Sequence, residues 1–302
     1  MKKALVTGGA GFIGSHIVDE LVKRGYQVVA LDNESAESND QFYWNENATK
    51  EVVDITDWDA LNAVFEREKP DYVFHLAAES RIQPTLERPQ RACEVNFLGT
   101  CNVLQAARTH KAKRVMYSST SSAYGLDNTP PLKEDMHRDC LNPYSVTKVA
   151  AEDLCKMYYS LWGLETVIFR YFNIYGERQP IKGVYAPVVG IFQRQHGAGE
   201  PMTIVGDGLQ RRDFTHVSDV VQANLLAAES ERDDVLGEIF NVGTGKNHSV
   251  LDVSKMVGGE YKHIEARPGE AEITLANIAK IQEYLNYEPT VELEDWINGQ
   301  KR

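Results

Sequence analysis

A tyrosine and a lysine at 144 and 148 could do acid–base chemistry in this 302-residue chain. Asn142 and Pro143 precede them as a typical N-cap and first helical residue, which predicts a helix over 143–161 with both side chains on one face. A nearby ammonium and the positive helix end both favour a phenolate, so we expect the pKa of Tyr144 to fall toward neutrality. Such a phenol could exchange a proton with a sugar hydroxyl while hydride moves to a nicotinamide. The spacing by itself is weak, and a solvated surface pair is the alternative.

The first glycine cluster of the chain could hold a pyrophosphate. Residues 4–6 are typical of a short buried strand, and 12–23 have apolar residues at helical spacing. Gly8 and Gly11 lie between them, and Gly14 lies in the first turn of the expected helix. Glycines let the backbone approach a phosphate closely, and the helix N-terminus offers free N–H groups and a positive dipole end.

Asp32 makes this a specific prediction. It ends a second expected strand over 26–31, eighteen residues past Gly14. A carboxylate there can accept hydrogen bonds from the adenosine ribose hydroxyls and repels a 2′-phosphate. The pattern therefore predicts an NAD site, and a glycine turn in an unrelated α/β protein is the alternative.

Strand and helix patterns alternate as far as residue 172. Further strands are expected at 51–55, 72–76, 114–117 and 166–170, and further helices at 58–68 and 89–110. This alternation predicts an α/β fold, a doubly wound parallel Rossmann sheet with ligands at the carboxyl ends of its strands. We expect an NAD-binding domain over 1–172 and a smaller substrate-binding lobe over 173–302, with segments such as 238–242 returning to the main sheet.

Bulk properties exclude several classes of protein. The net charge of −12 argues against a nucleic-acid partner or an anionic membrane surface. Four cysteines show neither a CxxC pair nor metal spacing, and no apolar run is long enough to span a membrane, so we expect a cytoplasmic protein. The histidines are not spaced as ligands, which predicts no metal. His75, on a strand, is expected to be a satisfied core histidine.

Four ordered motifs resemble those of the extended short-chain dehydrogenase/reductases. They are Thr7-Gly8-Gly9-Ala10-Gly11-Phe12-Ile13-Gly14, His75-Leu76-Ala77-Ala78, Tyr144-x-x-x-Lys148 and Arg170-Tyr171-Phe172-Asn173-Ile174-Tyr175-Gly176. Within that superfamily the chain is most similar to the UDP-glucose and UDP-N-acetylglucosamine 4-epimerases, from its first residue to about residue 290.

The resemblance implies where NAD would bind. Its residues are Gly8, Gly11, Phe12, Ile13 and Gly14 at the pyrophosphate, Asp32 and Asn33 at the adenosine ribose, Asp54 and Ile55 at the adenine, Leu76, Ala77, Ala78 and Phe172 toward the nicotinamide, Asn96 as a support, and Tyr144 with Lys148 at the nicotinamide ribose. For Asp54 and Asn96 the sequence equally allows polar groups that only close loops.

The segment 118–125 bears most on the reaction. In the family, 4,6-dehydratases carry an Asp-Glu pair at the positions of Ser121 and Ser122, decarboxylases carry Glu at Ser122, and 3,5-epimerases carry Cys in this loop. This chain has hydroxyls there, which can relay a proton from a sugar O4 but cannot eliminate water. Thr120 and Ser122 match the catalytic Ser/Thr of two different branches, so both are candidates. A serine-rich turn without chemistry is the alternative.

The resemblance also implies a substrate site for a UDP-sugar. Its residues are Ser80, Thr120, Ser121, Ser122, Tyr144, Asn173, Arg212, Arg267, Glu270 and Thr274. Arginine forks suit a diphosphate. A small residue at 274 leaves room for an N-acetyl group on the sugar. Glu270 and Asn277 stand where Asp is usual, which leaves the fine nucleotide contacts open.

Together these features predict an isomerase, an NAD-dependent 4-epimerase of a UDP-hexose that works through a transient 4-keto sugar. Family members pair through the helices at 89–110 and 143–161, so we expect a homodimer. The alternatives are a UDP-glucuronate 4-epimerase, a 4-keto-sugar reductase and a non-catalytic dinucleotide sensor.

Overall fold

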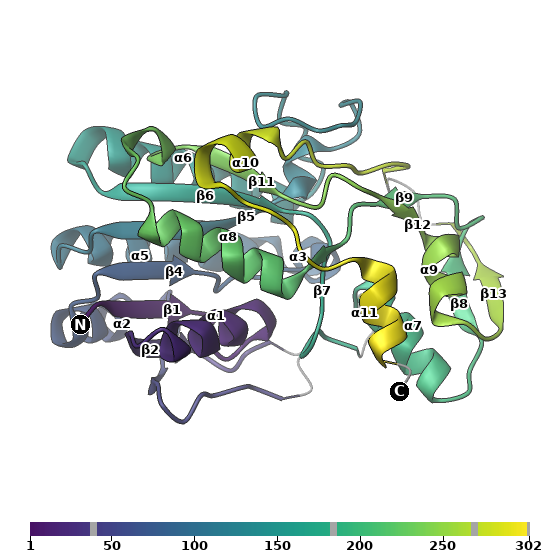
Figure 1. Cartoon of the computed structure of the whole chain (residues 1–302). Helices are drawn as coiled ribbons and strands as arrows, with labels where there is room; N and C mark the ends of the chain where they lie inside the picture. The colour runs from purple at the N-terminus through teal and green to yellow at the C-terminus, as the bar shows by residue number, and fades with distance from the viewer. Residues whose placement is uncertain (37–40, 182–185, 267–270, 301–302) are drawn as a thin grey trace.

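Seven parallel strands form the central sheet, in the order β11-β6-β5-β4-β1-β2-β3 (Figure 1). The structure, a computed structural model, describes residues 1–36, 41–181, 186–266 and 271–300. The strands of the sheet are β1 (Lys3–Thr7), β2 (Gln27–Asp32), β3 (Thr49–Val52), β4 (Tyr72–His75), β5 (Arg114–Thr120), β6 (Glu165–Tyr171) and β11 (Ile239–Val242). The strand order reverses between β1 and β4, the place where open α/β sheets bind ligands. The predicted α/β fold is confirmed.

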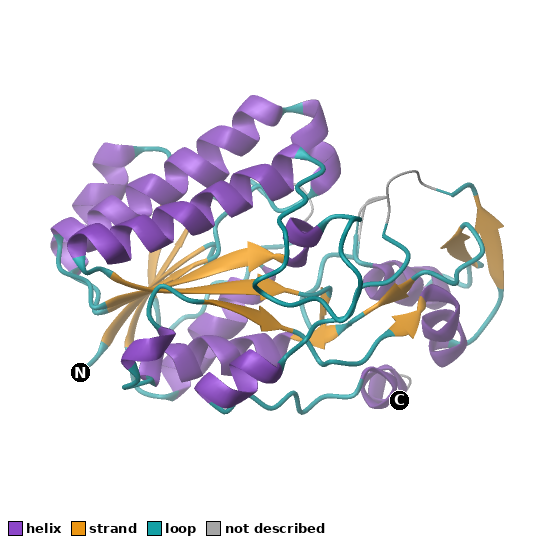
Figure 2. Ribbon diagram, turned by 90° about the horizontal axis from the view of Figure 1, so that it is seen from above, coloured by secondary structure: helices purple, strands orange, loops and turns teal. Residues whose placement is uncertain are grey.

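Alternate residues of β1 point into two separate cores, as strand geometry requires. Val6 packs with Ile17 and Val220 on one face of the sheet. Leu5 packs with Leu104 on the other face. Figure 2 shows helices on both sides of the strands. The layer beneath Val6 contains α1 (Phe12–Lys23), α8 (Val217–Glu229) and α10 (Ala279–Leu285), and the layer over Leu5 contains α2 (Trp58–Glu68), α5 (Thr100–Thr109) and α6 (Pro143–Trp162).

Three elements differ from the expected ones. β3 covers Thr49–Val52 rather than 51–55, because Asp54 accepts a hydrogen bond from the Thr56 backbone N–H and turns the chain. The expected helix over 89–110 is divided into α4 (Pro89–Ala92), a π-helical segment η1 (Cys93–Gly99) and α5. In η1 the Thr100 hydroxyl donates to the Asn96 carbonyl at 2.7 Å. β5 extends to Thr120, so the serine-rich segment begins on the strand.

The C-terminal lobe has a core of its own. Phe192, Ile204, Val253 and Ile297 pack together there. Its elements are α7 (Val188–Gly197), β8 (Met202–Val205), α9 (Val250–Val257), β13 (Tyr261–Ile264) and α11 (Leu293–Gln300). Two short strand pairs lie between this lobe and the main sheet (Figure 1): β7 (Ile174–Tyr175) with β10 (Thr215–His216), and β9 (Arg211–Arg212) with β12 (His248–Ser249).

β11 follows α8 in the chain and extends the main sheet. It pairs in parallel with β6, with Phe240 opposite Phe169. The expected return of 238–242 to the sheet is therefore seen. The remaining short helices are α3 (Ile82–Glu87), η2 (Ser121–Tyr124) and η3 (Asp233–Val235). Within the described ranges, none of the helices is both long and apolar enough to cross a membrane.

Candidate active site

Helix α6 carries Tyr144 and Lys148 at its N-terminal end. The Asn142 side chain accepts a hydrogen bond from the Ser145 backbone N–H at 2.9 Å, and the Asn142 N–H donates to the Ser145 hydroxyl at 3.3 Å. This reciprocal cap fixes the residue at which the helix begins and thus the face that its next residues occupy. Pro143 is the first helical residue, as expected.

Burial acts against both ionised forms of this pair. Desolvation raises the pKa of the Tyr144 phenol, although a hydrogen bond with Thr120 acts in the opposite direction. Desolvation lowers the pKa of Lys148 to about 7. The prediction that the pKa of Tyr144 falls is therefore wrong for this structure, because the loss of water outweighs the hydrogen bond with Thr120.

Hydroxyl groups gather at the end of β5, where this strand meets α6. The Thr120 hydroxyl bonds the Tyr144 phenol and accepts from the Ser122 backbone N–H at 3.1 Å. The nearby carboxylate, Glu152, accepts instead from the Ser119 hydroxyl at 2.5 Å and from Arg170. Among the described residues, no carboxylate is hydrogen-bonded to Ser121 or Ser122. This arrangement can pass a proton, and the carboxylate at the far end of the turn, Asp139, accepts hydrogen bonds from the Leu126 and Asp127 backbone N–H groups.

The glycine turn between β1 and α1 is tightly packed. Gly8 has φ of +68°, and a Cβ there would lie 2.9 Å from the Ala77 backbone N. A Cβ on Gly14 would lie 2.0 Å from the Gly8 carbonyl oxygen. Gly11 caps α1 without a side-chain hydrogen bond, so the first N–H groups of the helix, which include those of Phe12 and Ile13, remain available to an anion. The turn thus fits a pyrophosphate.

A buried chain of hydrogen bonds supports this turn. The Leu76 and Ala77 backbone N–H groups donate to the Thr7 hydroxyl at 3.2 Å. Thr7 in turn contacts His75 Nδ1 at 2.7 Å, and His75 Nε2 lies 2.9 Å from the Thr100 hydroxyl. Because Thr100 donates its own proton to a carbonyl, His75 must donate to Thr100 and accept from Thr7. Burial lowers the pKa of His75 to about 3, and it is the satisfied core histidine that was expected.

Three of the expected adenosine residues lie together at the ends of β2 and β3. The buried Asp32 accepts from the Ala10 and Glu34 backbone N–H groups at 3.2 and 2.9 Å. The Asn33 amide donates to Asp54 at 2.9 Å. Asp54 also accepts from Arg91, and hydrogen bonds from Thr56 and Arg91 hold its pKa at about 2 although burial acts to raise it. These contacts place a rigid acidic edge at the end of β2.

Asn96 connects two parts of the site. Its amide oxygen accepts from the Glu79 backbone N–H at 2.8 Å, and its amide nitrogen donates to the Glu79 carbonyl at 3.0 Å and to Thr147 at 3.1 Å. Thr147 lies on α6, between the two candidate catalytic residues. The side chain therefore closes the loop after β4, which contains Ala78 and the exposed Ser80, and fixes it to α6.

Three of the expected substrate residues, Asn173, Arg212 and Thr274, lie on the side of the C-terminal lobe. Asn173 has φ of +38°, and its amide donates to the Asp213 carbonyl at 2.8 Å and to the Thr274 hydroxyl at 3.4 Å. Arg212 donates to the Arg211 carbonyl at 2.9 Å. The buried Asp213 carboxylate accepts from the Thr244, Gly245 and Ala276 backbone N–H groups and from the Thr244 hydroxyl, and the Asp213 carbonyl accepts from the Asn173 amide. Asp213 thereby joins three segments that are distant in sequence.

Two of the expected cofactor residues have buried side chains, and two expected substrate residues are not described. Ile55 belongs to the core formed with α2 and α5. Phe172 is fully buried against Tyr124. Arg267 and Glu270 lie outside the described residues.

Comparison with known proteins decides the family. A family model described as "NAD dependent epimerase/dehydratase family" matches residues 4–243. The chain belongs to this family. It is 36% identical to a putative UDP-glucose 4-epimerase of Methanocaldococcus jannaschii over 97% of this chain and 95% of that protein. It is 39% identical to a UDP-N-acetyl-α-D-glucosaminuronate decarboxylase of Bacillus cytotoxicus over 84% of this chain and 78% of that protein.

A solved structure agrees with this assignment. The UDP-glucose 4-epimerase of Thermotoga maritima, determined with UDP-glucose, superposes with a TM-score of 0.92 at 34% identity. The match covers 98% of this chain and 96% of that chain. The resemblance to the nucleotide-sugar epimerases that was expected from the motifs is confirmed, and this member of the epimerase/dehydratase family is expected to use NAD, as the family does.

Sequence reasoning missed the supporting residues of this family member. Glu152, Arg170, Asp213 and Thr7 were not among the expected site residues, yet they hold the segments that carry the site. Glu152 lies four residues after Lys148, on the same face of the helix, and that spacing is the one signal that could have identified it.

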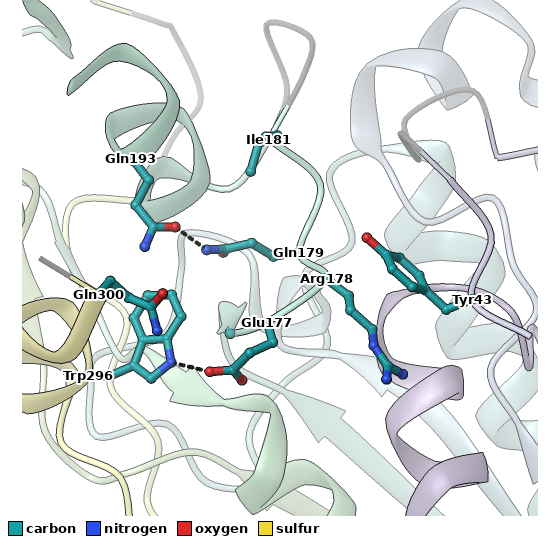
Figure 3. A pocket seen from close by; sticks show the side chains of 9 residues that line it. Tyr43, Glu177, Arg178, Gln179, Ile181, Gln193, Trp296 and Gln300 are labelled. Atoms are coloured by element: carbon teal, nitrogen blue, oxygen red, sulfur yellow. Dashed lines mark hydrogen bonds between the residues drawn. The ribbon is translucent and has the colours of Figure 1, made fainter. Parts of the chain in front are cut away.

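A separate pocket of about 260 Å³ lies between α11 and the loop after β7 (Figure 3). The Trp296 indole donates to the Glu177 carboxylate at 2.7 Å, and the Gln179 amide donates to Gln193 at 2.9 Å. On the opposite side, Arg178 lies over the Tyr43 ring. None of the expected site residues lines this pocket. In the described ranges, no group of three or more His, Cys, Asp or Glu side chains is placed to hold a metal ion.

Proposed function

We propose that this protein is an NAD-dependent 4-epimerase of a UDP-hexose. The observation that carries the proposal is the placement of Tyr144 beside Thr120, in a turn lined by hydroxyls. A dehydratase or decarboxylase needs an additional acid or base at that turn, and among the described residues no carboxylate is hydrogen-bonded to Ser121 or Ser122, while Glu152 is held by Arg170. Proton transfer at one sugar hydroxyl is the chemistry that remains.

NAD fits the residues at the carboxyl end of the sheet. The open N-terminus of α1 suits its pyrophosphate, and the buried Asp32 suits a ribose diol and disfavours a 2′-phosphate. When bound, NAD supplies the hydride acceptor and donor. The residues proposed to hold it are Gly8, Gly11, Phe12, Ile13, Gly14, Asp32, Asn33, Asp54, Ile55, Leu76, Ala77, Ala78, Asn96, Tyr144, Lys148 and Phe172.

The protein's own groups provide the proton path. Tyr144 takes the proton of the sugar O4, directly or through Thr120 or Ser122, and returns it at the end of the reaction. As an ammonium, Lys148 stabilises the phenolate that forms, which offsets the effect of burial on the Tyr144 pKa. The cap at Asn142 and the Asn96–Thr147 contact hold the helix in place during this transfer.

We propose that residues 1–172 mainly hold NAD and residues 173–302 mainly hold the nucleotide sugar. The adjacency of Asn173 and Thr274, with Arg212 close in sequence to their shared support Asp213, favours this division. Arg212 and Arg267 would bind the diphosphate, Glu270 the uridine ribose, and Ser80, Ser121, Ser122 and Asn173 the sugar. The short side chain of Thr274 favours UDP-N-acetylhexosamines in addition to plain UDP-hexoses.

The test is to denature the purified protein, look for released NAD, and follow UDP-glucose, UDP-N-acetylglucosamine and UDP-glucuronate with the native protein by NMR. We expect conversion to the 4-epimers without stoichiometric use of NADH or NADPH. Tyr144→Phe should abolish conversion while NAD remains bound. Consumption of NAD(P)H would favour a reductase, release of CO₂ a decarboxylase, and full activity of Tyr144→Phe would contradict the assigned role.

We also propose a homodimer formed through η1 and α6. Apolar side chains are exposed on these adjacent segments, with exposed fractions of 40% for Phe97, 50% for Leu98 and 50% for Val146. A second copy with the same surface would bury them on both partners. Sedimentation should give a dimer for the unmodified protein and a monomer for a Leu98→Glu, Val146→Glu variant. A monomer in both cases would refute the dimer.

We assign the protein to the cytoplasm. Cys93, Cys101, Cys140 and Cys155 are all free thiols, which suits a reducing compartment. Cell fractionation with the native protein tests this assignment, and recovery outside the cytoplasm would contradict it.

A further inference from the structure

Lys148 is a buried cation without an ionic partner. Its side chain is 3% exposed. Among the residues that the structure describes, its ammonium makes neither an ion pair nor a hydrogen bond, because the carboxylate one turn along α6, Glu152, is engaged by Arg170 and Ser119. A desolvated ammonium with no partner loses its proton readily. The proposed function needs Lys148 as an ammonium, so another interaction must favour its protonated form.

The ring of Tyr117 lies where it can favour the protonated form of Lys148. Lys148 Nζ is 4.5 Å from the centroid of this ring. Tyr117 is fully buried on β5, its hydroxyl donates to the Lys148 backbone carbonyl at 3.3 Å, and its ring lies 5.6 Å from the ring of His75. The ring is thus fixed by its neighbours and cannot turn away from the ammonium.

We propose that Tyr117 is a positioning residue whose ring face keeps Lys148 protonated and directed toward Tyr144. The inference rests on the proposed function, in which the Lys148 ammonium stabilises the Tyr144 phenolate. The negative face of an aromatic ring attracts a cation, and the attraction is strongest where water is excluded. Tyr117 itself touches neither substrate nor cofactor in this proposal.

The other groups around Lys148 do not take over this role. His75 on β4 is neutral, since its pKa is lowered to about 3 by burial. On α6, burial raises the pKa values of Tyr144 and Cys155, so both are uncharged at neutral pH, and the charge of Glu152 is compensated by Arg170. The charge of Glu152, weakened by its pairing with Arg170, and the ring face of Tyr117 therefore act together against the desolvation of Lys148, whose pKa burial lowers to about 7.

The consequence is a defined change in pH dependence. Loss of the ring should lower the pKa of Lys148 by about one unit, a tenfold change in the protonation equilibrium. A larger fraction of the enzyme then lacks the ammonium at pH 8. The decline of activity on the alkaline side of the pH profile should therefore begin at a lower pH. Activity at pH 6.5 should change less.

The experiment compares Tyr117→Leu, Tyr117→Phe and Phe65→Leu with the unmodified holoenzyme. Tyr117→Phe retains the ring, and Phe65→Leu removes a buried ring from the same core without a cation nearby. The alkaline limb of kcat should move to lower pH by about one unit in Tyr117→Leu alone. An unmoved limb in Tyr117→Leu, or an equal shift in Tyr117→Phe, would overturn the proposal.

A second readout does not depend on the reaction. The Lys148 Nζ resonance of ¹⁵N-lysine-labelled protein, assigned through Lys148→Met, reports its pKa directly. We expect a lower value in Tyr117→Leu than in the unmodified protein or Tyr117→Phe. This shift would support the role of the ring even if no sugar were epimerised. A failure of the proposed function can therefore be distinguished from a failure of the proposal about Tyr117. If Tyr117→Leu does not fold, Tyr117→Met provides the same comparison, and equal Lys148 pKa values there would refute the proposal.

Discussion

The carboxylate of Glu152 and the guanidinium of Arg170 form a bidentate ion pair inside the protein, with Nε–Oε1 and Nη2–Oε2 distances of 2.9 and 2.7 Å. Both side chains are almost completely buried. The same carboxylate accepts from Ser119, so the pair joins α6, β5 and β6 behind the candidate catalytic residues. Because Glu152 is engaged in this way, its carboxylate is not free to act as an acid or base at the hydroxyl-lined turn.

Removal of one partner of this pair should be strongly destabilising. Glu152→Gln or Arg170→Met leaves a buried charge without compensation, which costs about 3–5 kcal/mol of unfolding free energy. Urea denaturation measures this cost. The exposed pair between Arg138 and Asp153 provides the control, because Arg138→Ala should cost less than about 1 kcal/mol. Equal effects at the two sites would contradict the structural role of Glu152 and Arg170.

Thr120 and Ser122 should differ in importance. Thr120 lies beside the Tyr144 phenol and contributes to its pKa. Ser122 contacts Thr120 through its backbone N–H and not through its hydroxyl. Thr120→Ala should lower kcat at least about 100-fold, as is usual for the loss of a proton-transfer group. Ser122→Ala should have a much smaller effect, and Thr120→Ser should recover most of the activity. A larger loss in Ser122→Ala would identify Ser122 as the relay. Steady-state kinetics on the preferred UDP-sugar decide the matter.

Lys148 should destabilise the nucleotide-free protein at neutral pH. Its pKa is about 7 in the folded state, because of burial, and about 10.5 when unfolded. The unfolded state therefore binds more protons between these values, and stability rises as the pH increases from about 7 to about 10. Lys148→Met should be more stable by several kcal/mol at pH 7, an order-of-magnitude value from the pKa difference. The gain should shrink toward zero near pH 10. Urea titrations of both proteins over this range would show a constant difference if the assigned pKa were wrong.

Alanine at Gly14 should abolish NAD binding. Its Cβ would lie 2.0 Å from the carbonyl oxygen of Gly8, so the backbone of the turn must move. Gly197→Ala is the matched control, since a Cβ there meets no atom within 4 Å. We expect NAD in the purified control and little or none in Gly14→Ala, measured by absorbance after denaturation. Normal NAD content in Gly14→Ala would show that the turn can adapt.

Thr274→Tyr should separate the two classes of sugar. Thr274 lies 3.4 Å from the Asn173 amide, so a larger side chain enters the proposed sugar pocket. The turnover of UDP-N-acetylglucosamine should fall at least tenfold, while that of UDP-glucose should be retained, in line with the modest discrimination that added bulk provides. Thr274→Ser controls for loss of the methyl group. Unchanged turnover of the N-acetyl sugar would remove Thr274 from the specificity determinants.

Local signals in the sequence accounted for the elements that carry the reaction. The boundaries of α1 and α2 match their apolar periodicity, and Asn142 with Pro143 placed the first residue of α6. These features depend on residues within one or two turns of each other, so the chain encodes them locally. The family could be recognised from the sequence for the same reason, because each of its motifs lies within a short contiguous segment.

The sequence by itself therefore determined the βαβ dinucleotide unit, the Tyr144–Lys148 pair and the absence of an acid in the hydroxyl turn. Only the tertiary structure decided the direction of the Tyr144 pKa shift, the ring of Tyr117 beneath Lys148 and the bonds from Asp213 to residues 244–245 and 276. Each of these depends on burial or on contacts between residues far apart in the chain. Desolvation and long-range hydrogen bonds have no local pattern, because they arise when separate elements pack and exclude water.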